Sequence, residues 1–199
     1  MASLTRRAAL LVAATLTAAT LAACSSGSDD SMPGMDHNVT PMTSSSSATT
    51  DAARAGDVMF AQMMIPHHEQ AIDMADMALA ESSASAKVRS LATDIKKAQD
   101  PEVDTMKGWL TTWGASTAAP SGMDHGSGMM SDGDMDDLHA ARGAAFDRMW
   151  LRMMITHHEG AITMAEQVLS TTKDAEVTKL AEAIIEAQKV EIDTMSKLI

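Results

Sequence analysis

The chain has 199 residues, with 27 Asp or Glu against 15 Lys or Arg, which gives a formal net charge of −12 at pH 7. Such an acidic chain is not expected to bind nucleic acid through phosphate contacts, and anionic lipid repels its surface. It contains 19 Met but a single Cys and no Tyr. This composition excludes disulfides within the chain and a thiolate metal site, and it predicts a core rich in thioethers.

The N-terminal 23 residues resemble a secretory signal peptide and are not expected to fold with the rest. Two arginines precede an Ala- and Leu-rich segment over 8–23, which is too short for a good transmembrane helix. This segment ends in Leu-Ala-Ala-Cys24, a sequence that resembles the lipobox of bacterial lipoproteins. We therefore expect export, a lipid anchor on Cys24, and a polar, flexible tether over 24–50. The anchor would hold the chain on the outer face of the cell membrane or in the periplasm.

An internal duplication dominates the rest of the sequence. Residues 57–75 match residues 147–165, and residues 88–106 match residues 177–195. Each copy comprises two segments with helical periodicity and one apolar face, joined by a short polar turn. Neither hairpin can bury its apolar face alone, so we predict an all-α, antiparallel four-helix bundle from two repeated helical hairpins. The bundle would span 51–199, with repeat one over 51–113, a Met-, His- and Gly-rich linker over 114–135 and repeat two over 136–199.

The first helix of each repeat carries two adjacent histidines on its apolar face. At 100° per residue, His67 and His68 share that face with Met63 and Met64, so each His has a Met one turn before it. A polar group on a buried face costs free energy unless it is paired, so these histidines need a reason. Imidazole and thioether donors suit copper, and thioethers favour Cu(I). The pattern therefore predicts a copper site on this face.

The second helix of repeat one places Gln99, Glu102 and Met106 on its own apolar face. Glu102 is expected to bind the metal or to orient a histidine, with Gln99 supporting the ligands without binding the metal. The second repeat has the same candidate metal ligands at Met153, Met154, His157, His158, Glu191 and Met195, with Gln188 in the supporting position. The competing interpretation is a structural His–Glu hydrogen bond with Met as core filler. Glu69 and Glu159, which follow the histidine pairs, point away from this face and are discounted.

Both predicted flexible segments also contain methionine and histidine. Met35-Asp36-His37 lies in the tether, and Met123-Asp124-His125 lies in the linker, followed by Met129 and Met130. A methionine in a solvated segment has no core to fill, so packing does not explain these residues. We therefore predict capture of a soft metal by Met35, His37, Met123, His125, Met129 and Met130, with compositional drift as the competing explanation.

Two prolines break the symmetry of the repeat. Pro66 precedes the first histidine pair where repeat two has Thr156, and Pro101 lies beside Glu102 where repeat two has Val190. A proline inside a helix removes one backbone hydrogen bond and kinks the helix. We therefore predict that the two metal sites differ in geometry and affinity.

The pattern Met-Met-Ile-x-His-His-x-x-Ala-Ile-x-Met-Ala, followed by Gln-x-x-Glu-x-x-x-Met on the next helix, resembles domain-of-unknown-function family 305. The resemblance covers 51–199. It implies a ferritin-like four-helix bundle outside the cytoplasm, in a family that includes a periplasmic copper-binding protein, with Cu(I) or Ag(I) bound by Met and His in some members. Carried over by position, the implied ligands are Met64, His67, His68 and Met106, and Met154, His157, His158 and Met195 in repeat two.

Two other functions stay open from the sequence. A ferritin-like di-iron or di-manganese oxidase needs Glu-x-x-His motifs, but Ile72 lies three residues after Glu69 and each hairpin has one inward carboxylate. A scaffold bundle that binds another envelope protein fits if the His–Glu pairs are structural. No catalytic constellation is evident. The predicted function is therefore copper binding for tolerance, storage or handover, with a second copy of the chain or a copper-handling envelope protein as candidate partners.

Overall fold

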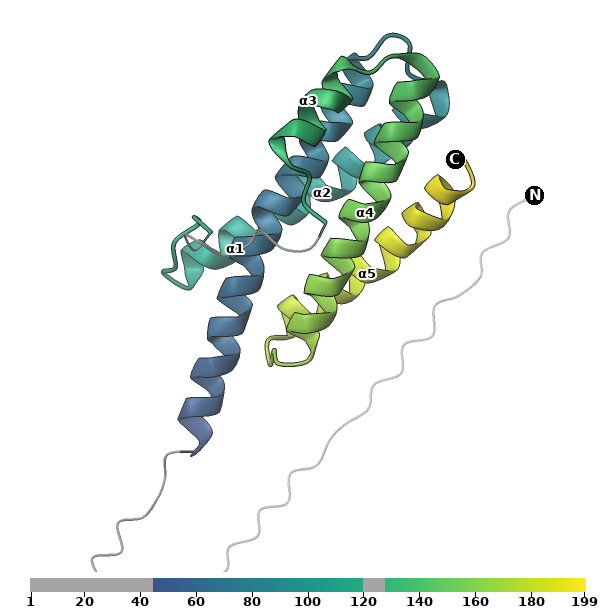
Figure 1. Ribbon diagram of the computed structural model, residues 1–199. Coiled ribbons are helices and arrows are strands. Elements are labelled where there is room, and N and C mark those ends of the chain that lie inside the picture. The colour runs from purple at the N-terminus through teal and green to yellow at the C-terminus, as the bar shows by residue number, and fades with distance from the viewer. Residues whose placement is uncertain (1–44, 120–127) are drawn as a thin grey trace, which may run out of the picture. The chain divides into compact units, whose positions relative to one another are not determined.

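The computed structural model describes residues 45–119 and 128–199, with side chains from residue 51 onward. These residues form α1 (Ser45–Ala80), α2 (Ala86–Thr112), α3 (Asp132–Ala140), α4 (Gly143–Leu169) and α5 (Ala175–Ser196) (Figure 1). The described residues contain helices and no strand, so the predicted all-α class is confirmed. Within these two ranges, no helix combines the length and the apolar character that crossing a membrane requires. The predicted lipid and linker positions Cys24, Met35, His37, Met123 and His125 lie outside the described residues.

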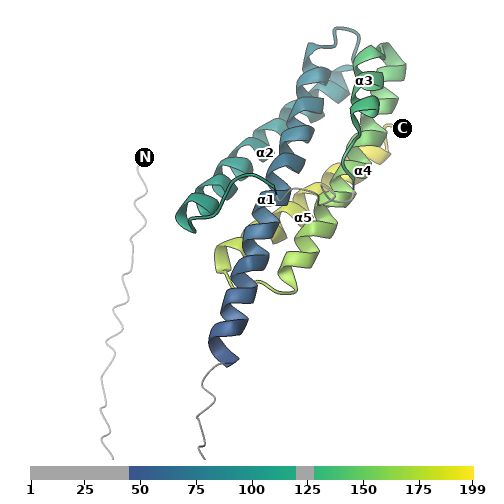
Figure 2. The ribbon, with the colours of Figure 1, turned by 60° about the vertical axis from the view of Figure 1, so that its left-hand side comes forward.

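The four long helices form two hairpins that pack side by side. α1 pairs with α2, α4 pairs with α5, and α1 also packs against α4 (Figure 2). The second helix of each hairpin begins at a capping residue. The Ser85 hydroxyl accepts a hydrogen bond from the Val88 N–H, and the Asp174 carboxylate accepts from the N–H groups of Glu176 and Val177. Each such cap contributes about 1 kcal/mol to helix stability, so both turns are well defined.

Two helices begin inside segments that the sequence pattern assigned to flexible connections. α1 begins at Ser45, within the predicted tether, and α3 begins at Asp132, within the predicted linker. In front of α3, the Ser131 hydroxyl accepts from the Asp134 N–H while the Asp134 carboxylate accepts from the Ser131 N–H. α3 has 9 residues and buries Leu138 alone, so it is too short to show a helical period in the sequence.

The core consists of two apolar clusters separated by a layer of polar side chains. On α1, Phe60 and Met64 belong to one cluster and Met74 and Ala78 to the other, with the adjacent histidines between them. The same order of apolar, polar and apolar residues recurs on α2, α4 and α5. We call the intervening residues the central polar layer; they are His67, His68, Gln99, Glu102, His157, His158, Gln188 and Glu191. This layer crosses the middle of the bundle.

The indole of Trp150 contributes to the alignment of α4 with α1. Trp150 is fully buried in one apolar cluster, and its Nε1 donates a hydrogen bond to the carbonyl oxygen of Met74 at 2.8 Å. A buried indole N–H needs such a partner, because leaving it unpaired costs free energy. This hydrogen bond connects the two hairpins within the apolar cluster around Trp150, outside the central polar layer.

The end of the linker, residues 128–130, forms a strap between α1 and α4. Gln70 of α1 holds it from one side: its Nε2 donates to the Met130 carbonyl oxygen at 2.9 Å, and its Oε1 accepts from the Met130 N–H at 2.7 Å. On the other side, a Cβ placed on Gly128 would lie 2.6 Å from the carbonyl oxygen of Thr156. In the repeat alignment Gly160 of α4 occupies the position of Gln70. The two repeats therefore differ where the strap binds.

Replacing Gly128 by Ala is expected to loosen the strap. Gly128 has φ of 93°, a region that other residues rarely adopt, and its Cβ would collide with backbone atoms of α4. The local cost should be about 1–3 kcal/mol. Hydrogen exchange of the Met130 amide, which Gln70 protects, should accelerate accordingly. The Gly133→Ala variant is the control, since a Cβ there meets only the Ser131 Oγ at 3.8 Å; equal exchange rates in both variants would contradict the expectation.

Candidate metal site in the central polar layer

One histidine of each adjacent pair is hydrogen-bonded to the glutamate of the neighbouring helix. The His68 Nε2 lies 2.8 Å from the Glu102 Oε2, and the His158 Nε2 lies 2.7 Å from the Glu191 Oε2. Both imidazoles are fully buried, whereas both glutamates are 19% exposed. The carboxylates accept from Nε2, and the Nδ1 of each ring has no hydrogen-bond partner among the described residues. A buried Nδ1 lone pair of this kind can bind a metal ion, and the hydrogen bond to the glutamate fixes the orientation of its ring.

The other histidine of each pair meets its repeat across the contact between α1 and α4. The ring centroids of His67 and His157 are 3.7 Å apart, and the ring planes are tilted by 36°. Both side chains are buried. Burial lowers the pKa of His157 well below its ordinary value of 6.5, and the neighbouring His67, His158 and His68 lower it further. His157 is therefore a neutral imidazole in the folded chain, which is the form that binds metals.

The two glutamines of the layer are buried beside the histidines. Gln99 on α2 is 2% exposed and Gln188 on α5 is 3% exposed. Within the part of the chain that the structure describes, neither side-chain oxygen has a hydrogen-bond partner. An amide oxygen that is buried without a partner costs free energy, so its retention in both repeats marks the layer as a place for a polar ligand.

The predicted methionine ligands flank the layer from its two apolar clusters. Met64 and Met106 are fully buried in one cluster, and Met154 and Met195 are fully buried in the other. Met63 is also buried, whereas its repeat Met153 is only half-buried and packs against the cluster around Trp150. The first four methionines therefore belong to the apolar clusters on the two sides of the layer, and the Met63 and Met153 positions are less equivalent than the sequence repeat predicts.

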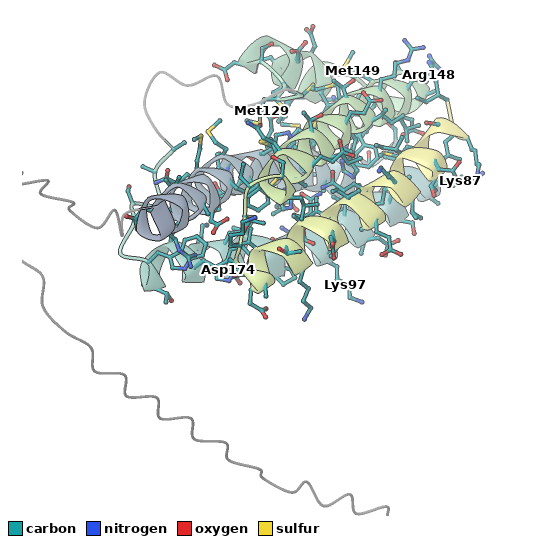
Figure 3. All side chains as sticks on the ribbon, turned by 90° about the horizontal axis from the view of Figure 1, so that it is seen from below. Lys87, Lys97, Met129, Arg148, Met149 and Asp174 are labelled. Atoms are coloured by element: carbon teal, nitrogen blue, oxygen red, sulfur yellow. The ribbon has the colours of Figure 1, made fainter. Side chains whose placement is uncertain are left out.

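The other residues that the sequence analysis considered as metal ligands lie outside the interior of the central polar layer. Glu69 and Glu159 are exposed, as expected, and Glu69 pairs with Lys107 at 2.7 Å. Met129, which is labelled in Figure 3, and Met130 of the strap are both half-buried according to their solvent exposure. The sequence reasoning missed Gln70, which holds the strap. The exchange of Gln70 for Gly160 between the repeats is the signal that could have found it.

The two prolines leave the His–Glu contacts unchanged. α1 continues through Pro66 and α2 continues through Pro101. The His68–Glu102 and His158–Glu191 distances differ by only a tenth of an ångström, and the burial of the partners is the same. These contacts therefore show no difference between the repeats, and a difference in geometry and affinity of the two metal sites stays a prediction. Pro101 is exposed and Pro66 is half-buried, and both helices continue without a break. The repeats do differ at the strap.

The donor set of the layer fits a soft metal better than a hard one. Among residues 51–119 and 128–199, no three or more His, Cys, Asp or Glu side chains gather so that they could hold a metal ion. The donors that the layer and its flanking clusters offer are imidazole nitrogens and methionine thioethers, and thioether ligands favour Cu(I) and related soft cations. Neutral imidazoles and thioethers bring no positive charge that would repel a cation. The acidic surroundings therefore favour a cation in the layer.

Known proteins are similar to this chain in fold and in sequence. The family model described as "Domain of unknown function (DUF305)" matches residues 57–199. A putative secreted DUF305 protein from Streptomyces coelicolor is 30% identical, with a TM-score of 0.68 over 72% of this chain and 91% of that chain. CopM in its Cu(I)-bound form is 35% identical, with a TM-score of 0.61 over 71% of this chain and 94% of CopM. CopM in Cu(II)-bound and Ag-bound forms is also similar to this chain.

A shorter match links the chain to a viral protein. The uncharacterized protein L153 of Acanthamoeba polyphaga mimivirus is 39% identical over 64 residues, which cover 31% of this chain. The matched region spans 42% of the length of L153. This match covers too little of either protein to carry an argument about function.

Proposed function

Because this chain belongs to the DUF305 family, we propose that it binds copper as Cu(I), and Ag(I) as its chemical analogue, in the central polar layer. The observation that carries the proposal is the layer itself. Four buried histidines and two buried glutamines separate two apolar clusters. Burial of polar atoms without a hydrogen-bond partner costs stability. The Nδ1 atoms of His68 and His158 and the side-chain oxygens of the two glutamines are such atoms among the described residues, and a bound cation would give them a partner.

The roles of the individual residues follow from their contacts. The Nδ1 atoms of His68 and His158 are donors, and Glu102 and Glu191 hold these rings through Nε2. The neutral ring of His157 is a further donor, together with His67, whose ring packs against it at a tilt. The thioethers of Met64, Met106, Met154 and Met195, which lie in the apolar clusters that flank the layer, would provide the preference for Cu(I). In this proposal Glu102 and Glu191 position the histidines rather than bind the metal, with Gln99 and Gln188 supporting them.

We propose storage or handover of copper outside the cytoplasm rather than catalysis. The similarity to a putative secreted DUF305 protein supports export, and the lipobox-like sequence at Cys24 supports a lipid anchor. The Met and His residues of the tether and linker would capture the ion before it reaches the layer. A di-iron or di-manganese oxidase is the weaker alternative, since the described residues lack the carboxylate-rich cluster that such a site uses. A scaffold without metal is the other alternative, and the His–Glu hydrogen bonds favour it.

An anaerobic Cu(I) titration against a chromophoric chelator tests the proposal. The full-length chain is compared with a variant in which His67, His68, His157 and His158 are all replaced by Ala. We expect the wild-type chain to compete with the chelator and the variant to bind at least about 100-fold more weakly, because its imidazole donors are gone. The matched control is the Glu69→Gln, Glu159→Gln variant, whose exposed carboxylates follow the same histidine pairs. Equal binding by the histidine variant and the control would refute a metal site in the layer and leave the scaffold function.

A further inference from the structure

A groove outside the central polar layer gathers a second set of soft donors. It has a volume of about 500 Å³ and lies where α1, α3 and the start of α4 meet. α1 contributes Asp73, Asp76 and Met77, and α3 contributes Met135 and His139. The nearby Phe146 of α4 is buried and forms the apolar floor. Two thioethers and one imidazole therefore face a single hollow on the surface.

The two α3 residues have the spacing that lets a helix present a pair of ligands. Met135 and His139 are four residues apart, so their side chains lie on the same face of α3. Met64 and His68 in the central layer have the same spacing. Met135 and Met77 are half-buried and pack against the core cluster around Trp150. This packing restricts the positions of both thioethers. His139 is exposed at the rim and its side chain is open to solvent.

The charges around the groove favour a cation. Asp73 and Asp76 are exposed on the α1 side. Four further carboxylates lie on α3, at Asp132, Asp134, Asp136 and Asp137. Lys96 pairs with Asp76, and Arg142 pairs with Glu81 at the end of the groove, so two cations offset part of this charge. The surplus of carboxylates raises the local concentration of positive ions. His, Asp and Glu alone form no metal cluster among the described residues, so the donors that decide selectivity here are the thioethers.

We propose that this groove is a separate binding site for a soft monovalent cation, Cu(I) or Ag(I), with Met77, Met135 and His139 as its ligands. Among the described residues, α1 is not preceded by a separate short helix as α4 is by α3, so this groove is formed beside repeat two, whereas the central layer is built from both repeats. Because the groove is open to solvent and the layer is buried, the groove binds and releases its ion more rapidly. The donors of the groove are distinct from those of the layer. A test of the groove site is therefore independent of the function proposed above.

Methionine methyl and histidine nitrogen NMR of the full-length chain during Ag(I) titration tests the groove directly. We expect the methyl signals of Met77 and Met135 and the ring nitrogens of His139 to shift on addition of Ag(I). The variant Met135→Leu, His139→Gln should bind one equivalent of Ag(I) fewer, and its Met77 signal should no longer respond. Neither residue is fully buried, so the variant is expected to fold, and circular dichroism checks this.

The control is Met149→Leu, a half-buried methionine of α4 that packs on the same cluster but does not line the groove (Figure 3). This variant should keep the full stoichiometry and the Met77 response. Unchanged signals of Met77 and Met135 in the wild-type chain would overturn the groove site, and so would an unchanged stoichiometry in the double variant. Groove signals that respond while the layer histidines stay silent would support the groove and contradict the central site.

Discussion

Replacing both His67 and His157 by Leu is expected to abolish tight Cu(I) binding and to leave the metal-free bundle at least as stable as the wild-type protein. The two rings lie 3.7 Å apart in the core and are both buried. Leucine has a similar volume and needs no polar partner, and replacing two interacting polar groups by apolar ones is nearly neutral or stabilising. We therefore expect the free energy of unfolding to stay constant or rise by about 1–2 kcal/mol. Cu(I) affinity should fall by more than about 100-fold because two donors are lost.

This result would separate a functional histidine pair from a structural one. If the stacked rings hold the two hairpins together, the double leucine variant should lose about 1–3 kcal/mol of stability, since it breaks a buried polar network. Urea unfolding of the metal-free wild-type and variant proteins measures the difference, and the chelator titration measures the affinity. A destabilised variant that still binds Cu(I) tightly would reverse the assignment of this pair.

The pH dependence of unfolding provides an independent readout of the same variant. Burial holds the pKa of His157 well below its ordinary value of 6.5, so the unfolded chain binds a proton that the folded chain excludes. Stability from this residue is therefore complete above pH 6.5 and falls as the pH drops below it, by about 1.4 kcal/mol per pH unit until the folded pKa is reached. The leucine variant should lack this contribution, and its unfolding free energy should decline less steeply below pH 6.5. Parallel curves would show that His157 is not excluded from protonation.

The sequence was sufficient to predict that the histidines and glutamines of the layer are buried. His67, His68, Gln99 and Met106 lie on apolar faces, and the spacing of 3.6 residues per turn places them there whatever the helix packs against. The contact of a histidine with Glu102 was also expected, either as a structural pair or as a means of orienting a ligand. Local periodicity and the duplication together were therefore enough for the bundle and for the composition of the central polar layer.

The different contacts of the two adjacent histidines could not be predicted from helical periodicity and the duplication. His68 meets the glutamate of its own hairpin, whereas His67 meets His157 of the other hairpin. Which ring turns which way depends on how α1 crosses α4, and no pattern within one helix contains that information. The strap has the same origin, because the contact of Gln70 with Met130 joins residues 60 apart in the chain. The effect of Pro66 on the metal site stays a prediction, because the His–Glu contacts, which are alike in both repeats, do not measure it.

Replacing Glu102 and Glu191 by Gln is expected to weaken Cu(I) binding without unfolding the bundle. Glutamine has nearly the same shape, and its side-chain oxygen still accepts from the histidine Nε2 that lies 2.8 Å or 2.7 Å from the present carboxylates. The negative charge is lost, however, so the opposite nitrogen, Nδ1, becomes a weaker donor. Loss of a carboxylate that supports a metal-binding histidine typically reduces metal affinity by about 10–100-fold.

The single variants Glu102→Gln and Glu191→Gln then compare the two repeats. Because the two contacts have the same length and burial, we expect equal losses of Cu(I) affinity in the chelator titration. Unequal losses would locate a difference between the repeats that the His–Glu contacts do not show, with the strap at Gln70 as its nearest structural source. The Glu69→Gln, Glu159→Gln variant again serves as the control, since it removes the same number of charges from exposed positions. If it weakens binding as much as the double variant at Glu102 and Glu191, the effect is one of overall charge, and the carboxylates do not act through the histidines.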